Sequence, residues 1–132
     1  MGNDLILNLN DGYVGIGTAN PKEKLSVNGN IRSKEVKVEI TNWPDYVFEE
    51  DYKIKSLDNL EKYIKENKHL PEVPRAKEIT DNGLDLGEMN KILLKKIEEL
   101  TLYLIDQNKT LIEQQSLLLK QREDIDTLKS SK

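Results

Sequence analysis

The last third of the chain carries the most regular hydrophobic pattern. From Asp85 onward, apolar residues recur at alternating steps of four and three over six heptads, and neither proline nor glycine occurs after Gly87. Asp85 and Glu88 have the spacing of a capping box, which marks the start of a helix. The pattern therefore predicts a coiled-coil helix over residues 85–132, with an apolar stripe about 65 Å long at ~1.5 Å per residue.

Such a helix needs partner helices, because it is too long to fold back on the rest of so short a chain. Its seam carries glutamine at three consecutive d positions. A second apolar stripe, Ile105, Ile112 and Leu119, widens the apolar face and favours three strands, with a dimer or tetramer as alternatives. With Asn90 as the first a position, the expected trimer-interface residues are Leu86, Leu93, Ile97, Leu100, Leu104, Gln107, Leu111, Gln114, Leu118, Gln121, Ile125 and Leu128.

Residues 1–41 show a different pattern, in which short stretches alternate between apolar and polar residues and turn signals separate them. Two or three such strands are not stable without cover for their apolar face. We expect other copies of the chain to provide that cover, so that this β-stranded stem is intertwined in a homotrimer. The alternating sets are Leu5, Leu7 and Leu9, then Leu25 and Val27, then Val36, Val38 and Ile40, with turns at Asp11-Gly12 and Asn28-Gly29.

Residues 42–84 predict a small mixed α/β knob. Ser56 stands where an N-cap is expected for a short helix, with Leu57, Leu60 and Ile64 on one face, and Pro71 follows its end. The three segments together predict an α+β fold: a stem, a knob and a long coiled-coil helix. The knob also holds the aromatic residues that would contact a receptor if they were exposed, namely Trp43, Tyr46, Phe48 and Tyr52.

Composition limits the chemistry that this chain can carry. Only 36% of its 132 residues are apolar against 33% charged, which is lean for a monomeric core. The absence of cysteine excludes a disulfide framework, a thiol nucleophile and a thiolate metal site. A net charge of −4 offers no basic surface for nucleic acid, and no apolar run approaches the ~20 residues of a membrane span. We therefore expect no nucleic-acid partner and no membrane insertion.

Some residues are of a type that could bind a cofactor or act in catalysis, but the further residues that such a site requires are missing. Gly15-Ile16-Gly17 is like the opening of a dinucleotide loop, but Asn20 stands at the third glycine position. His69, the single histidine, has Glu66 and Glu72 nearby but no nucleophile and no complete ligand set. A metal shared by three copies of His69 is the alternative to a histidine that caps a helix end. We expect no enzyme activity, no cofactor and no metal site.

Four stretches of the sequence resemble a known group of proteins. They are VGIGTANPKEKLSVNGNIR, WPDYVF, HLPEVP and LGEMN, within a resemblance that covers roughly residues 12–110. They are similar to the C-terminal region of tail-fibre-domain proteins of Bacteroidota and their phages, and distantly to intramolecular chaperone domains of the endosialidase type. The resemblance implies a trimeric fibre terminus, with intertwined strands, a knob and a helical bundle, on a virion fibre or a cell surface.

Three functions are consistent with that resemblance. The first is a module that trimerises and terminates a fibre, in which the coil sets the register of the chains. The second is host attachment, in which the knob contacts a bacterial surface polysaccharide or protein. The third is a self-cleaving chaperone, but its Ser-Asp motif is absent, and in a strand Ser33 and Lys34 would point to opposite faces. We therefore expect the first function.

Overall fold

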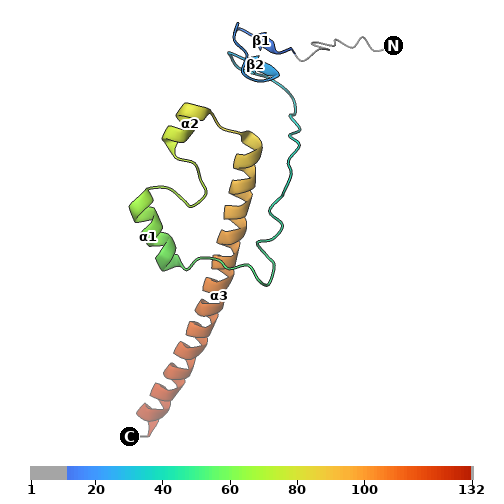
Figure 1. Cartoon of the computed structure of the whole chain (residues 1–132). Helices are drawn as coiled ribbons and strands as arrows, with labels where there is room; N and C mark the ends of the chain where they lie inside the picture. Colours follow the sequence, from blue (N-terminus) through green and yellow to red (C-terminus); the bar gives the residue numbers. More distant parts are fainter. Residues whose placement is uncertain (1–11, 132) are drawn as a thin grey trace, which may run out of the picture. The chain divides into compact units, whose positions relative to one another are not determined.

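The computed structural model describes residues 12–131, and its elements make an α+β fold (Figure 1). Two short strands, β1 (Val14–Ile16) and β2 (Leu25–Val27), precede three helices, α1 (Leu57–Asn67), α2 (Ala76–Asn82) and α3 (Leu86–Ser130). The predicted α+β class and the predicted long C-terminal helix are thus confirmed. The chain divides into two compact units between residues 37 and 38, so the knob and the long helix share the second unit.

The first unit is built around a parallel pair of strands. Ile16 of β1 lies opposite Val27 of β2, and the strand predicted around Leu25 is confirmed. The predicted turn at Asn28 bends the chain after β2, where its backbone N–H donates to Ile16 O at 2.9 Å and its side-chain amide donates to Gly17 O at 3.2 Å. Gly17 has a φ of 70°, which a residue with a Cβ adopts only with strain. These two bonds close the connection between the strands.

The strand predicted at residues 36–40 is wrong, because this segment belongs to no strand. Val38 and Ile40 instead approach the start of α3. A Cβ added at Gly87 would lie 3.0 Å from Val38 Cγ1 and 3.3 Å from Ile40 Cδ1, so the absence of a side chain there lets the segment come close. Alternation identifies an apolar face but does not say whether a strand or a helix covers it. The strand predicted at Leu5, Leu7 and Leu9 and the start of the predicted turn at Asp11 lie outside the described residues.

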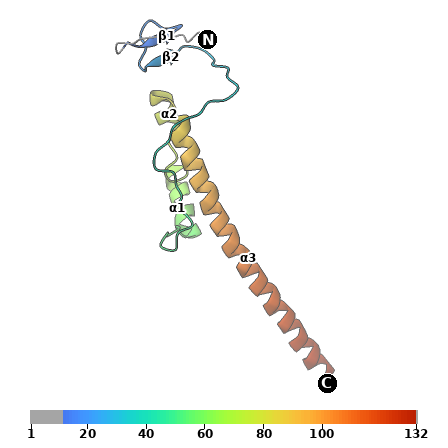
Figure 2. The ribbon, with the colours of Figure 1, turned by 90° about the vertical axis from the view of Figure 1, so that its right-hand side faces the viewer.

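In the second unit, α1 and α2 flank the N-terminal half of α3, and the C-terminal half of α3 extends beyond them (Figure 2). The predicted helix of the knob is confirmed as α1. Ser56 is its N-cap, and the Ser56 hydroxyl accepts the backbone N–H of Asn59 at 3.3 Å. The helix ends at Lys68, which has a left-handed φ of 62°.

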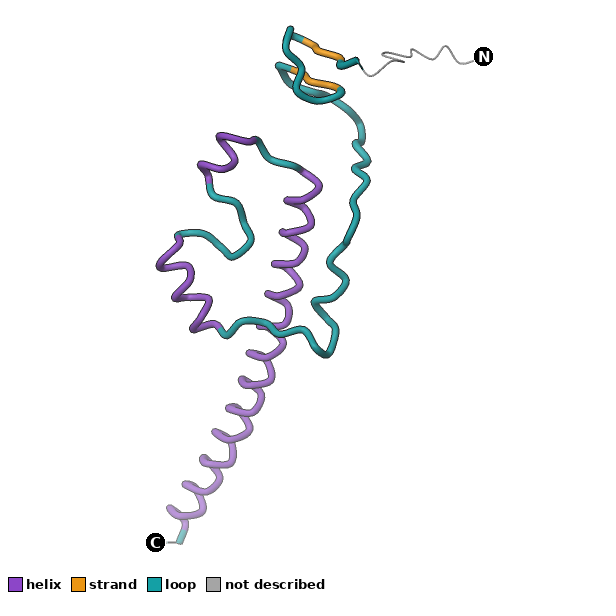
Figure 3. The backbone as a smooth tube through the Cα atoms, in the orientation of Figure 1, coloured by secondary structure: helices purple, strands orange, loops and turns teal. Residues whose placement is uncertain are grey.

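The loop after α1 leads into α2, a helix of seven residues that the hydrophobic pattern did not predict (Figure 3). Glu78 supports its first turn, because the Glu78 carboxylate accepts the backbone N–H of Arg75 at 3.0 Å. The helix ends at Gly83, where φ is 79°. Seven residues make about two turns, which are too few for a hydrophobic period to be recognised.

α3 contains 45 residues and begins after the N-cap residue Asp85. The predicted capping box is wrong, because the Asp85 side chain makes no capping hydrogen bond and Glu88 pairs with Lys91 at 3.1 Å. Among residues 12–131, no helix is both long enough and apolar enough to cross a membrane.

A single copy of this chain has almost no hydrophobic core. In the described part of the chain the buried residues are Val47, which is 1% exposed, Pro44 and Pro71. The accessible surface is 12362 Å², whereas a folded monomer of 15.2 kDa would have about 7,100 Å². The excess surface means that much of the apolar area of this chain is not covered by the chain itself.

Candidate functional site

The helix α3 has two different faces, and the rest of its unit packs against one of them. The packed residues, which we call the covered row, are Gly87, Lys91, Lys95, Glu99 and Tyr103, each four positions after the last. Four residues turn a helix by about 40° more than a full turn, so the covered row runs obliquely across α3. The segment that precedes α1 makes contacts along this row.

At the N-terminal end of the covered row, two lysines hold the preceding segment. Lys91 Nζ donates a hydrogen bond to Thr41 O at 3.4 Å. Lys95 Nζ lies 5.6 Å from the centroid of the Tyr46 ring, which is a cation–π distance. Both contacts use the end of a long side chain, so the lysine stems lie between the segment and the helix.

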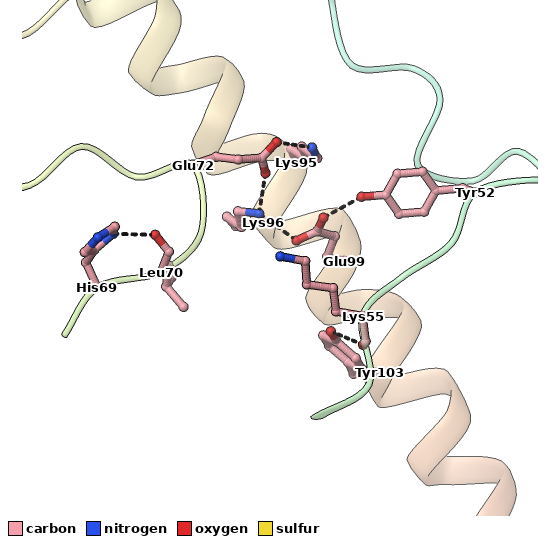
Figure 4. Close-up of polar contacts among 9 residues, drawn as sticks. All are labelled: Tyr52, Lys55, His69, Leu70, Glu72, Lys95, Lys96, Glu99 and Tyr103. Atoms are coloured by element: carbon pink, nitrogen blue, oxygen red, sulfur yellow. Dashed lines mark hydrogen bonds and ion pairs between the residues drawn. The ribbon is translucent and has the colours of Figure 1, made fainter. Parts of the chain in front are cut away.

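At the C-terminal end of the covered row, two tyrosine hydroxyls make the contacts (Figure 4). Tyr52 donates to Glu99 Oε1 at 2.5 Å, and Tyr103 donates to Lys55 O at 2.7 Å. Partial burial raises the pKa of Tyr52, and the hydrogen bond to Glu99 and the negative charge of Glu99 raise it further. Burial and the charge of Glu99 also raise the pKa of Tyr103. Both phenols therefore keep the protons that they donate.

Glu72, from the loop after α1, joins two lysines of α3. Its carboxylate accepts from Lys95 Nζ at 2.5 Å and from Lys96 Nζ at 2.7 Å, and Lys96 also donates to Glu99 Oε2 at 2.9 Å (Figure 4). Partial burial raises the pKa of Glu72 and lowers those of both lysines. The mutual hydrogen bonds and opposite charges outweigh burial, so the pKa of Glu72 is lowered and those of Lys95 and Lys96 are raised. The network is ionised at neutral pH and fixes the loop to the helix.

The opposite side of α3 is uncovered. All of the predicted interface residues are exposed, including Ile97 (59%) and Leu104 (63%). By contrast, Ile92 and Leu102, on other sides of the same helix, are partly buried. We call the uncovered set the exposed stripe, and it consists of Leu86, Leu93, Ile97, Leu100, Leu104, Gln107, Leu111, Gln114, Leu118, Gln121, Ile125 and Leu128.

The aromatic residues predicted as a receptor contact divide into two groups. Trp43, Tyr46 and Phe48 are exposed, whereas Tyr52 is partly buried by its contact with Glu99. Sequence reasoning assigned all four to one surface because they are close in the chain. Tyr52 differs from the others because its hydroxyl binds Glu99 of α3, although its ring centroid lies 5.9 Å from that of Tyr46.

His69 does not cap the end of α1. Its Nδ1 lies 2.8 Å from Leu70 O, and Arg75 Nε donates to its Nε2 at 3.1 Å (Figure 4 shows the first contact). A carbonyl accepts and a guanidinium donates, so the ring carries its proton on Nδ1. The expected bond to the last carbonyls of α1 is replaced by the Leu70 carbonyl. Among the described residues, no three His, Cys, Asp or Glu side chains gather as a metal site would require.

A cavity of about 350 Å³ lies between α1 and α3. Leu60 from α1 faces Leu100 and Tyr103 from α3 across it, and the loops supply the remaining walls. No local pattern in the sequence predicts this cavity or the Glu72 network, because both bring together residues from separate segments. Its lining on α3 continues into the exposed stripe at Leu100.

No protein-family model, no curated protein and no solved structure matches this chain. One face of α3 holds the knob, and the other carries the exposed stripe, which is apolar except at its three glutamines.

Proposed function

We propose that this chain is the self-association module at the end of a fibre-like surface protein, and that it acts as a parallel homotrimer. One observation carries the proposal. The knob packs against the covered row and leaves the exposed stripe bare along the whole of α3. A helix of a monomeric protein turns its apolar face toward the core, whereas here the polar and charged covered row faces the knob.

The energetics support association over a lone chain. Burying one Leu or Ile side chain contributes about 1.5–3 kcal/mol, and the exposed stripe contains nine of them. A stable interface buries roughly 1,200–2,000 Å² in total. The accessible surface of 12362 Å² exceeds that of a compact monomer by far more than this requirement.

Charges beside the exposed stripe favour a parallel arrangement. With Asn90 at an a position, Asp124 falls at a g position and Lys129 at the next e position. In a parallel coil these two positions on neighbouring helices face each other, so Asp124 of one copy meets Lys129 of the next. The breadth of the apolar face, which includes Ile105 and Ile112, supports three helices over two.

The first unit supports the fibre part of the proposal. Its strands form one pair of three residues each, which is too little to be stable alone. Ile16, Leu25 and Ile31 are exposed, at 56%, 56% and 70%. Copies of the chain joined by α3 would bring three such units together, and the resemblance to tail-fibre termini gives this arrangement a place on a virion fibre or cell surface.

Host attachment is the second candidate function. Trp43, Tyr46 and Phe48 are exposed near one another in sequence, and an exposed aromatic group is typical of a binding surface. Self-cleavage has less support. Ser33 and Lys34 lie outside the strands, so strand alternation no longer separates them, but the Ser-Asp motif is absent. We propose that the chain is not an enzyme, and intact mass spectrometry after days of incubation should show one full-length species.

Light scattering tests the proposal. The expected mass is three times 15.2 kDa at micromolar concentration. A monomeric mass together with an intact helical circular dichroism spectrum would overturn it. The chain has no cysteine, so Ser131→Cys provides an orientation test. Parallel helices place the three thiols together at one end, and mild oxidation should link two chains of each trimer. The unmodified protein is the control, and a trimer without this link would show that the helices are not parallel.

A further inference from the structure

The cavity between α1 and α3 lies on one flank of the exposed stripe. Five α3 residues line it: Lys95, Lys96, Glu99, Leu100 and Tyr103. In the heptad assignment Leu100 is a d residue of the exposed stripe, and Lys96 and Tyr103 are g residues one heptad apart. Along the helix axis Glu99 lies between these two g residues. Around the helix it occupies the neighbouring c position, which is further from the seam. The cavity therefore lies beside the g positions of its own helix, on the side that faces away from the seam.

In a parallel coil the g side of one helix faces the e side of the next. The e residues that correspond to Lys96 and Tyr103 are Thr101 and Asn108 of the neighbouring copy. Midway between these two, one step further from the seam, lies Ile105. Its position on the e side mirrors that of Glu99 on the g side. In a parallel in-register coil, residues with the same number lie at the same height, so Ile105 of the neighbouring copy lies two residues, about 3 Å, beyond Tyr103 at the C-terminal end of the cavity lining.

We propose that this cavity binds the Ile105 side chain of the neighbouring copy, so that each knob contacts α3 of the next chain. The inference rests on the proposed parallel trimer. It gives a specific contact to Ile105, which lies beside the a and d seam and is 46% exposed in a single copy.

The chemistry of the cavity suits an apolar occupant. The charged groups on its α3 side already neutralise one another, since Glu72 binds Lys95 and Lys96 and Lys96 binds Glu99. The remaining surface includes the aliphatic side chains of Leu60, Leu70 and Leu100.

The exposed apolar residues of α1 also support a contact with a neighbouring helix. Leu57 is 47% exposed and Ile64 is 38% exposed, although both lie on the apolar face of this helix with Leu60. No Cα atom of α1 lies within 8 Å of a Cα atom of α3, so α3 of the same copy leaves part of that face uncovered. A neighbouring helix that enters beside α1 would cover it.

Cysteine pairing between two variants tests the contact directly. Chains carrying Leu60→Cys are refolded together with chains carrying Ile105→Cys, so that a disulfide between the two types must join different copies. The expected result is a covalent dimer of the two variants under mild oxidation. The matched control replaces Ile105→Cys by Ile112→Cys, which is one heptad further along the same flank and should not pair. Equal pairing with both, or pairing with neither in a trimeric mixture, would overturn the inference.

A second measurement does not depend on disulfide geometry. Ile105→Ala should lower the melting temperature of the trimer by roughly 5 °C or more beyond Ile112→Ala, because the change empties three filled cavities per trimer. A cavity that holds a small ligand or another partner would leave the two variants equally stable, and the inference would fall. Light scattering distinguishes a failure of this inference from a failure of the proposed function. A trimer that lacks the Ile105 contact refutes this inference alone, whereas a monomer refutes the proposed function.

Discussion

Tyr52 and Glu99, 47 residues apart in the chain, are joined by a hydrogen bond of 2.5 Å from the phenol to the carboxylate. The other oxygen of Glu99 accepts from Lys96, so one carboxylate fixes the segment before α1 while Lys96 fixes the loop after it through Glu72. This pairing makes the knob and the first turns of α3 one unit. It also decides which side of the helix remains uncovered.

Removal of that hydrogen bond should destabilise the knob without breaking the trimer. Tyr52→Phe keeps the ring but leaves one oxygen of Glu99 without its donor, which costs about 1–3 kcal/mol for a partly buried carboxylate. Urea unfolding should show a lower midpoint, and light scattering an unchanged mass. Tyr13→Phe, an exposed tyrosine of the first unit, is the control and should change neither.

The contribution of the ion-pair network to the stability of the knob depends on pH. Glu72 has a lowered pKa in the folded chain, so its contribution is present above its ordinary value of 4.5 and is lost as the pH falls through the folded value. The lysines and Tyr52 have raised pKa values, so their contribution is present below their ordinary values and is lost as the pH rises through the folded values.

Melting temperatures between pH 3 and pH 9 should therefore form a plateau with a loss on the acid side. Glu72→Gln should flatten the acid side, because it removes the carboxylate that must be protonated there. Glu61→Gln, which removes an exposed carboxylate paired with Lys65 on α1, should leave the profile unchanged. Identical acid limbs for Glu72→Gln and the parent would show that the network does not govern this range.

The three glutamine layers should line the axis of the trimer. Gln107, Gln114 and Gln121 are exposed in a single copy and occupy consecutive d positions. An unpaired buried amide costs about 1–3 kcal/mol, so these side chains would bond to one another or to trapped water. Replacing all three by Leu should raise the melting temperature clearly and loosen the choice of oligomer state. If the triple variant melts lower than the parent, the heptad register is wrong, and the stripe of Ile105, Ile112 and Leu119 would be the better candidate for the axis.

A single charge on the exposed stripe should prevent assembly. Leu111→Asp would place three carboxylates around the axis in an apolar layer, which is costly because each charge loses its water. We expect a shift from trimer to monomer in light scattering and a large loss of helical circular dichroism in the C-terminal half. Lys109→Asp introduces the same residue two positions away at an outward-facing position, and it should remain trimeric. A trimeric Leu111→Asp variant would place the seam elsewhere.

The sequence alone determined the elements whose cause is local. The long helix was predictable because its apolar period runs over six heptads, and α1 was predictable because Ser56 and the following apolar residues form a local signal. The strand at Leu25 was predictable from alternation in the same way. The exposed stripe on α3 follows from the same period, since side chains at heptad spacing share one face whatever lies around them.

Tertiary structure decided what each face meets. Residues 36–40 alternate like a strand, yet Val38 and Ile40 lie against Gly87, because an apolar face is satisfied by whichever surface reaches it. The Tyr52 to Glu99 bond, the Glu72 network and the cavity at Leu60 all join residues from separate segments. No local period records such pairings, because they depend on where the chain turns between them. The sequence therefore determined that α3 has a stripe to bury, and only the folded knob decided that this chain leaves it bare.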